Sequence, residues 1–80
     1  MKVLLYSFRR CPYAIRSRLA LKVAKIDFIT EEINLKAKKE SFLTLSSKGT
    51  VPVLVHNNTE IIDESIDIML WAFKKKKLNN

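Results

Sequence analysis

The order of strand-like and helix-like segments most constrains what this 80-residue chain can fold into. Residues 1–6 centre on an apolar run that is typical of a buried strand. Residues 12–25 have the spacing of an amphipathic helix, and the β-branched and aromatic content of 27–33 predicts a second, less buried strand. Because strand–helix–strand connections are right-handed and join parallel strands, we expect these two strands to be parallel. The apolar residues expected on the buried face of the helix are Ile15, Leu19 and Val23.

The second half of the chain predicts a weak helix, a β-hairpin and a last helix. The weak helix falls in 36–45. The hairpin strands fall in 51–55 and 60–62, joined by a turn with two asparagines that tolerate positive φ angles. The last helix opens at Asp63 or Glu64. This order predicts an α/β fold with a four-stranded mixed sheet flanked by helices. The apolar residues at helical spacing in the last helix are Ile66, Met69, Leu70 and Phe73.

Length and composition predict one domain. A chain of 80 residues has room for one modest core, so we expect a single domain over 1–80 and no helical second domain. Its hydrophobic share of 48% and charged share of 29% are typical of a folded globular chain. No apolar run reaches the roughly 18 residues of a membrane span, and no signal-peptide pattern begins the chain. We therefore expect a cytoplasmic protein with no membrane partner.

The formal net charge of +7 would attract nucleic acid, anionic lipid or small anions without choosing among them. Basic residues are not interleaved with aromatics on one face, and no nucleic-acid reading motif is present, so we expect no specific nucleic-acid partner. The lysines of 74–77 are expected to form a solvated helix end, where cations complement the helix dipole. One cysteine, one histidine and one glycine leave no metal-ligand cluster and no glycine-rich phosphate loop.

Cys11, the only cysteine, lies where the first strand gives way to the first helix. Pro12 suits the first helical position, so the thiol is expected at a helix N-terminus. Unpaired N–H groups and the helix dipole favour the thiolate there. Arg9 and Arg10 either assist thiolate formation or are simply exposed. The alternative is a buried cysteine that only fills the core. With no second cysteine, any disulfide that Cys11 forms is intermolecular.

Three motifs together carry a resemblance to a known family. Residues 11–14, Cys-Pro-Tyr-Ala, resemble the active-site segment of glutaredoxins with the second cysteine replaced by alanine. Residues 15–21 are similar to the glutathione-binding N-terminal domain of omega-type glutathione transferases, which use a cysteine nucleophile. The pairs at 51–52, Val-Pro, and 64–65, Glu-Ser, complete the match over nearly the whole chain. The resemblance implies a thioredoxin-like fold.

The resemblance assigns a role to each matching residue. Cys11 would form a mixed disulfide with glutathione, and Tyr13 would flank its sulfur. Pro52 would be a cis proline. Val51 before it would offer its backbone N–H and C=O to the cysteinyl part of glutathione, much as an added strand does. The alternative for Pro52 is a trans proline at the start of an edge strand.

Three further residues would hold the ends of glutathione. The Glu64 carboxylate would bind the γ-glutamyl ammonium, while the Ser65 hydroxyl and N–H would bind the neighbouring carboxylate at a helix start. Helix capping by the same segment is compatible with these roles. Lys38 aligns with a lysine that reaches the glycyl carboxylate, although a solvated helix face also accounts for it.

The resemblance implies a glutathione-dependent, monothiol thiol–disulfide oxidoreductase. A glutathionylated protein or a small disulfide would pass its glutathionyl group to Cys11. A second glutathione would release it, because the chain has no second cysteine. Two alternatives stay open. One is a stand-alone or truncated transferase N-terminal domain that binds glutathione. The other is a transferase-fold module that binds other proteins without catalysis.

The last helix carries a second apolar face formed by Ile68, Trp71 and Ala72. Omega-type relatives carry a helical second domain after this module. We therefore expect this face to meet a second copy of the chain or a separate helical protein. His56 falls in the predicted hairpin, far from Cys11, and is expected to be a surface residue.

Overall fold

The strands form one mixed sheet in the computed structural model, which describes residues 2–33, 40–45 and 49–78. Within these ranges the sheet has four strands in the order β2-β1-β3-β4. β1 pairs parallel with β2 and antiparallel with β3, and β3 pairs antiparallel with β4. The predicted four-stranded mixed sheet, with its parallel first pair and antiparallel hairpin, is therefore confirmed. The strands are β1 (Val3–Ser7), β2 (Ile29–Glu32), β3 (Val53–His56) and β4 (Glu60–Ile62), and the helices are α1 (Pro12–Val23), α2 (Glu40–Leu45) and α3 (Ser65–Leu78).

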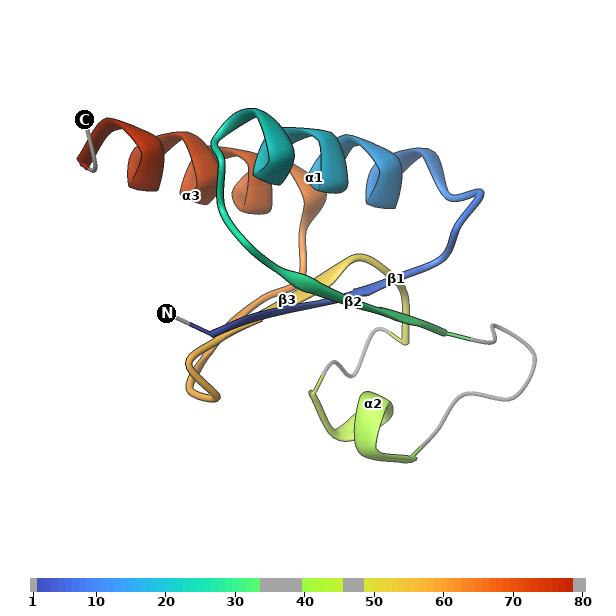
Figure 1. The fold of residues 1–80 in the computed structure, drawn as a ribbon. Coiled ribbons are helices and arrows are strands. Elements are labelled where there is room, and N and C mark those ends of the chain that lie inside the picture. The colour runs from blue at the N-terminus through green and yellow to red at the C-terminus, as the bar shows by residue number, and fades with distance from the viewer. Residues whose placement is uncertain (1, 34–39, 46–48, 79–80) are drawn as a thin grey trace.

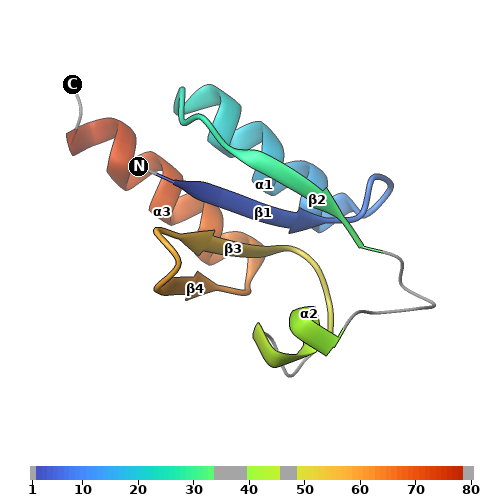
Figure 2. The ribbon, with the colours of Figure 1, turned by 60° about the horizontal axis from the view of Figure 1, so that its bottom comes forward.

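The helices cover the two faces of the sheet unequally. Figure 1 shows α1 and α3 together against one face and α2 on the other, and Figure 2 shows the same division from a second side. Alternate residues of β1 point to opposite faces of the sheet. Leu5 is buried with α1 and α3, whereas Tyr6 packs against Phe42 of α2, with ring centroids 5.4 Å apart. No helix in the described ranges is long and apolar enough to cross a bilayer.

The helix predicted over 12–25 is present, but the face that it buries was predicted wrongly. Leu19 and Val23 are exposed by 57% and 55%, and Ile15 is also on the surface. Small side chains cover most of the buried face, and they let the helix approach the sheet and α3 closely. Because alanine and serine are only weakly hydrophobic, the sequence pattern of this buried face was weaker than that of the larger apolar residues on the exposed face. The buried residues of α1 are Ala14, Ser17, Ala20 and Leu21.

The end of α1 is closed by backbone hydrogen bonds around Lys25, whose φ is 57°. The N–H of Lys25 donates to the carbonyl of Lys22, and the N–H of Ile26 donates to the carbonyl of Leu21. This pattern satisfies carbonyls that the last helical turn leaves unpaired. It also turns the chain toward β2, with Ile26 buried in the core.

The two apolar faces of α3 have exchanged the roles that the sequence predicted. Ile68 and Ala72 are fully buried and Trp71 is nearly so, which makes the expected partner face part of the core. Ile66 and Leu70, expected inside, are exposed, as is Phe73. A helix that is apolar on opposite sides gives no signal of which side meets the sheet.

The lysine block lies in the last turns of α3, as predicted. Lys74 is exposed, while Lys75 is half-buried and its ammonium lies 5.7 Å from the centroid of the Trp71 ring. Such a cation–π contact adds a modest attraction at a partly exposed site.

The hairpin between β3 and β4 is confirmed, with positive φ angles of 52° and 63° at Asn57 and Asn58. His56 was wrongly expected on the surface. Its side chain is only 13% exposed, its Nδ1 lies 3.0 Å from a Glu60 carboxylate oxygen, and its ring meets Trp71 edge-on. Strand pairing sets it opposite Val3, at the end of β1 remote from Cys11.

The two faces of α3 lead to a first prediction. Ile68→Ala removes a side chain that is 0% exposed, and we expect it to lower the free energy of unfolding by about 2–5 kcal/mol. The matched control, Ile66→Ala, truncates a side chain that is 66% exposed and should change stability by no more than about 0.5 kcal/mol. Urea unfolding followed by circular dichroism measures both. Equal losses in the two variants would contradict this orientation of α3.

Candidate functional site

A tight turn after β1 presents Cys11 at the start of α1. The Cys11 N–H donates to the carbonyl of Phe8 at 3.0 Å, and the Cys11 carbonyl accepts from the Ile15 N–H at 2.9 Å. Cys11 is the N-cap residue and Pro12 is the first residue of the helix, as predicted. The Cys11 side chain makes no capping hydrogen bond and is partly exposed. The thiol is therefore open to a reactant beside the positive end of the helix dipole.

Tyr13 follows in the first turn of α1 and is largely exposed. The Arg16 guanidinium lies 5.6 Å from the centroid of the Tyr13 ring, so the ring is partly covered by a cation. The carbonyl of Tyr13 accepts a hydrogen bond of 3.0 Å from the buried Ser17 hydroxyl. Together these contacts hold the first turn next to the thiol.

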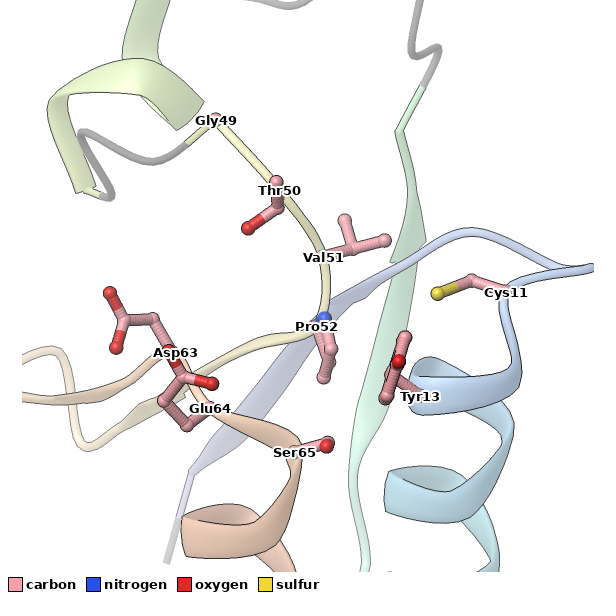
Figure 3. A pocket seen from close by; sticks show the side chains of 9 residues that line it. All are labelled: Cys11, Tyr13, Gly49, Thr50, Val51, Pro52, Asp63, Glu64 and Ser65. Atoms are coloured by element: carbon pink, nitrogen blue, oxygen red, sulfur yellow. The ribbon is translucent and has the colours of Figure 1, made fainter.

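The segment before β3 contains a cis peptide bond between Val51 and Pro52. The predicted cis form is confirmed, and the trans alternative is wrong. Pro52 is buried, whereas Val51 is half-buried. In Figure 3 the Cys11 sulfur points toward this segment, with Val51 across the cleft from it. A backbone that enters a cleft in this way can pair with a peptide ligand through its own N–H and C=O groups.

The start of α3 forms the opposite wall. Ser65 is the first residue of the helix, and the carbonyl of Glu64 accepts a 3.0 Å hydrogen bond from the Ile68 N–H. Figure 3 shows the Ser65 hydroxyl directed into the space between α3 and Tyr13, with Asp63 and Glu64 along the same wall. A helix N-terminus favours an anionic group, and a neighbouring carboxylate favours a cationic one. The wall can therefore hold both charges of a zwitterion.

These three segments line one cleft of about 600 Å³. That volume lies in the ~300–1,000 Å³ range of small-molecule sites. The cleft is open at the surface, and it brings together most of the residues that the resemblance assigned to glutathione. Its lining residues are Cys11, Tyr13, Gly49, Thr50, Val51, Pro52, Asp63, Glu64 and Ser65.

Some predicted residues lie elsewhere. Arg9 and Arg10 do not line this cleft. They lie with Phe8 and Glu32 around a separate hollow of about 450 Å³. Lys38 lies outside the described residues. Among the residues that the structure does describe, no group of three histidine, cysteine, aspartate or glutamate side chains could hold a metal ion.

Sequence reasoning missed Gly49, Thr50 and Asp63 as lining residues. Gly49 is buried with a φ of 64°, a conformation that glycine adopts without the penalty that a Cβ brings. As the only glycine in the chain, two residues before Val51, it was the available signal for this bend. Asp63 was interpreted only as a helix opener. Thr50 gave no signal of its own.

Comparison with known sequences identifies the family. A family model described as "Glutathione S-transferase, N-terminal domain" matches residues 10–74. The chain is 42% identical over 62 residues to glutathione S-transferase omega-2 of Rattus norvegicus, covering 78% of this chain and 25% of the rat protein. It is 35% identical over 80 residues to glutathione S-transferase omega-1 of Mus musculus, covering 96% and 33%.

Solved structures agree. Glutathione transferase Omega 3C from Trametes versicolor has a TM-score of 0.86 at 27% identity, over 94% of this chain and 34% of that one. A Tau class glutathione S-transferase from mango, Mangifera indica, has a TM-score of 0.87 at 28% identity, over 95% and 34%. This chain belongs to the glutathione S-transferase N-terminal domain family and has its thioredoxin-like fold. It spans a quarter to a third of the length of the curated relatives given above.

Proposed function

We propose that this chain is the glutathione-binding domain of an omega-type transferase, and that Cys11 forms a mixed disulfide with the bound tripeptide. The observation that carries the proposal is the single cleft in which Cys11, the cis Val51-Pro52 bond and the start of α3 meet. Each of these features came from a different stretch of the sequence. Their convergence supports one ligand that touches all of them.

The binding mode follows the chemistry of the cleft walls. The cysteinyl part of glutathione pairs with the Val51 backbone as a short added strand. The Ser65 hydroxyl and N–H bind the γ-glutamyl carboxylate at the N-terminus of α3, and Glu64 binds the ammonium. We assign the glycyl carboxylate to Lys38 on the resemblance alone. In this pose the glutathione sulfur faces the Cys11 thiol.

The reaction best suited to these groups is removal of glutathione from a mixed disulfide. The Cys11 thiolate attacks the glutathionyl sulfur of the substrate disulfide. The substrate leaves as a thiolate and takes up a proton, and a Cys11–glutathione disulfide remains. The thiolate of a second glutathione then attacks the glutathionyl sulfur of that disulfide. Oxidised glutathione leaves, and the Cys11 thiolate is restored.

An external thiol is required because Ala14 stands where a second cysteine would resolve the intermediate. Ala14 is fully buried on α1. A second glutathione must therefore enter from solvent, and the open cleft and partly exposed Cys11 allow this.

A second candidate is a domain that binds glutathione but turns over substrate only when a second, helical domain or protein is attached to it. Two observations favour it. The chain spans a quarter to a third of its relatives' length. The neighbouring helices α1 and α3 both carry exposed apolar side chains, which we take as one surface. We call this surface the outer face and infer that a helical body covers it in the active enzyme. The exposed apolar residues of the outer face are Ile15, Leu19, Val23, Ile66, Leu70 and Phe73.

Cys11→Ser tests the chemistry. The serine hydroxyl has almost the same size but is far less nucleophilic, so we expect the fold and glutathione affinity to be kept and the mixed disulfide to be lost. Mass spectrometry after incubation with oxidised glutathione should detect one glutathione adduct on the native chain and none on the variant. Release of glutathione from a glutathionylated peptide should fall to background.

The same assay separates the candidate functions. Turnover by the native chain supports the oxidoreductase proposal. An adduct without turnover supports the domain that needs another body. Failure to bind glutathione would overturn both and leave a module that binds other proteins.

Glu64→Gln tests the binding mode. Loss of the charge-assisted contact with the ammonium should weaken binding about tenfold or more, from a contact worth about 1.5–3 kcal/mol. Asp67→Asn is the matched control, because Asp67 is an exposed acid in the first turn of α3 that does not line the cleft. It should leave affinity within about twofold. Calorimetry with S-methylglutathione, which cannot form a disulfide, measures both. Equal effects would mean that only the net charge of the helix start matters.

A further inference from the structure

The turn that carries Cys11 is tied to the side chain of Arg18, two helical turns farther along the chain. The Arg18 Nη1 group donates to the hydroxyl of Ser7 at 2.9 Å, and its Nη2 group donates to the carbonyl of Arg9 at 3.1 Å. Ser7 is the last residue of β1 and is buried. One guanidinium thus joins α1 to the end of β1 and to the turn that follows.

A second charged side chain holds the same turn from the other side. The Arg9 N–H donates to a Glu32 carboxylate oxygen at 2.8 Å. Glu32 ends β2, which pairs with β1 at Ser7. The N–H and the carbonyl of Arg9 are therefore both held by side chains, one from β2 and one from α1. The Cys11 N–H closes the turn on the carbonyl of Phe8.

We propose that Arg18, together with Glu32, is a positioning residue that fixes the turn presenting Cys11. This inference rests on the role proposed for Cys11. Turns that carry reactive groups are mobile unless they are tied to the scaffold. A displacement of about 1 Å at a reacting atom can cost on the order of 100-fold in rate. One planar guanidinium that donates to both the end of β1 and the turn holds the turn in place relative to the sheet.

A positioning role and a purely electrostatic role for Arg18 predict different effects of substitution. If Arg18 acted only by its positive charge near the thiolate, lysine would replace it. If it acts by joining Ser7 to Arg9, lysine fails, because a single ammonium lacks the planar fork that reaches both acceptors. At position 32, a pair of substitutions separates the hydrogen bond from the charge. Glutamine keeps an oxygen that accepts from the Arg9 N–H, and alanine does not.

The experiment compares Arg18→Lys, Glu32→Gln and Glu32→Ala with the native chain, with Lys22→Gln as control. Lys22 is an exposed cation on the same helix that donates no hydrogen bond to the turn and does not line the hollow beside it. Three quantities are measured in each variant. They are amide hydrogen exchange at Arg9 and Cys11, the rate of Cys11 glutathionylation by oxidised glutathione across pH, and the affinity for S-methylglutathione.

We expect Arg18→Lys and Glu32→Ala to exchange the Cys11 amide faster and to slow glutathionylation about tenfold across the pH range. Affinity for S-methylglutathione should stay within about twofold, because its proposed anchors lie at Val51 and α3. Glu32→Gln and Lys22→Gln should behave as the native chain. A fall in rate with unchanged affinity separates positioning from general damage to the fold.

The inference is overturned if Arg18→Lys keeps native exchange and rate, since charge alone would then suffice. It is also overturned if Glu32→Gln and Glu32→Ala are equally impaired. Hydrogen exchange needs no ligand. If the native chain forms no adduct, the proposed function of Cys11 is refuted. The exchange data would still show whether Arg18 restrains the turn.

Discussion

The antiparallel pairing of β1 with β3 is the constraint on which the site depends. It sets Tyr6 opposite Val53, so the turn after β1 and the segment before β3 must meet at one end of the sheet. The thiol of Cys11 and the backbone of Val51 are neighbours for this reason. The β3–β4 hairpin then returns the chain so that Ser65 begins α3 at the same end. A shift of one residue in the β1–β3 register would turn the side chains of the shifted strand to the wrong faces of the sheet.

The parallel pairing of the first two strands, the hairpin and the positions of α1 and α3 followed from the sequence, because local patterns and the handedness of strand–helix–strand connections predict them. The asparagines at 57 and 58 and the cysteine before Pro12 are such local patterns. The antiparallel pairing of β1 with β3 had no such signal. The buried faces of the two helices did not follow. Leu19 has stronger hydropathy than Ala20, yet Ala20 is inside, because a helix packed against both a sheet and a neighbouring helix needs small side chains at the contacts. Sequence patterns report how hydrophobic a face is, not which face the tertiary structure covers.

Residues of the candidate site were predictable only where they belong to a recognisable sequence motif. Motifs marked Cys11, Pro52 and Ser65, and the cleft contains all three. The hydrogen bonds from Arg18 to Ser7 and Arg9 had no sequence signal, because an arginine on a helix that is rich in cations is first interpreted as solvated. The outer face was likewise visible only once the buried face of α1 and α3 was known. Both features emerge from tertiary contacts between residues distant in the chain.

The central claim is that one cleft joins the thiol, the Val51 backbone and the start of α3 around glutathione. Titration of the isotope-labelled Cys11→Ser chain with glutathione, followed by amide NMR, tests it most directly because no covalent chemistry intervenes. The account predicts saturable shifts of the Val51 and Ser65 amides with one shared dissociation constant, and no such shifts in the β3–β4 turn at Asn58. Shifts confined to other surfaces, or none at all, would contradict it.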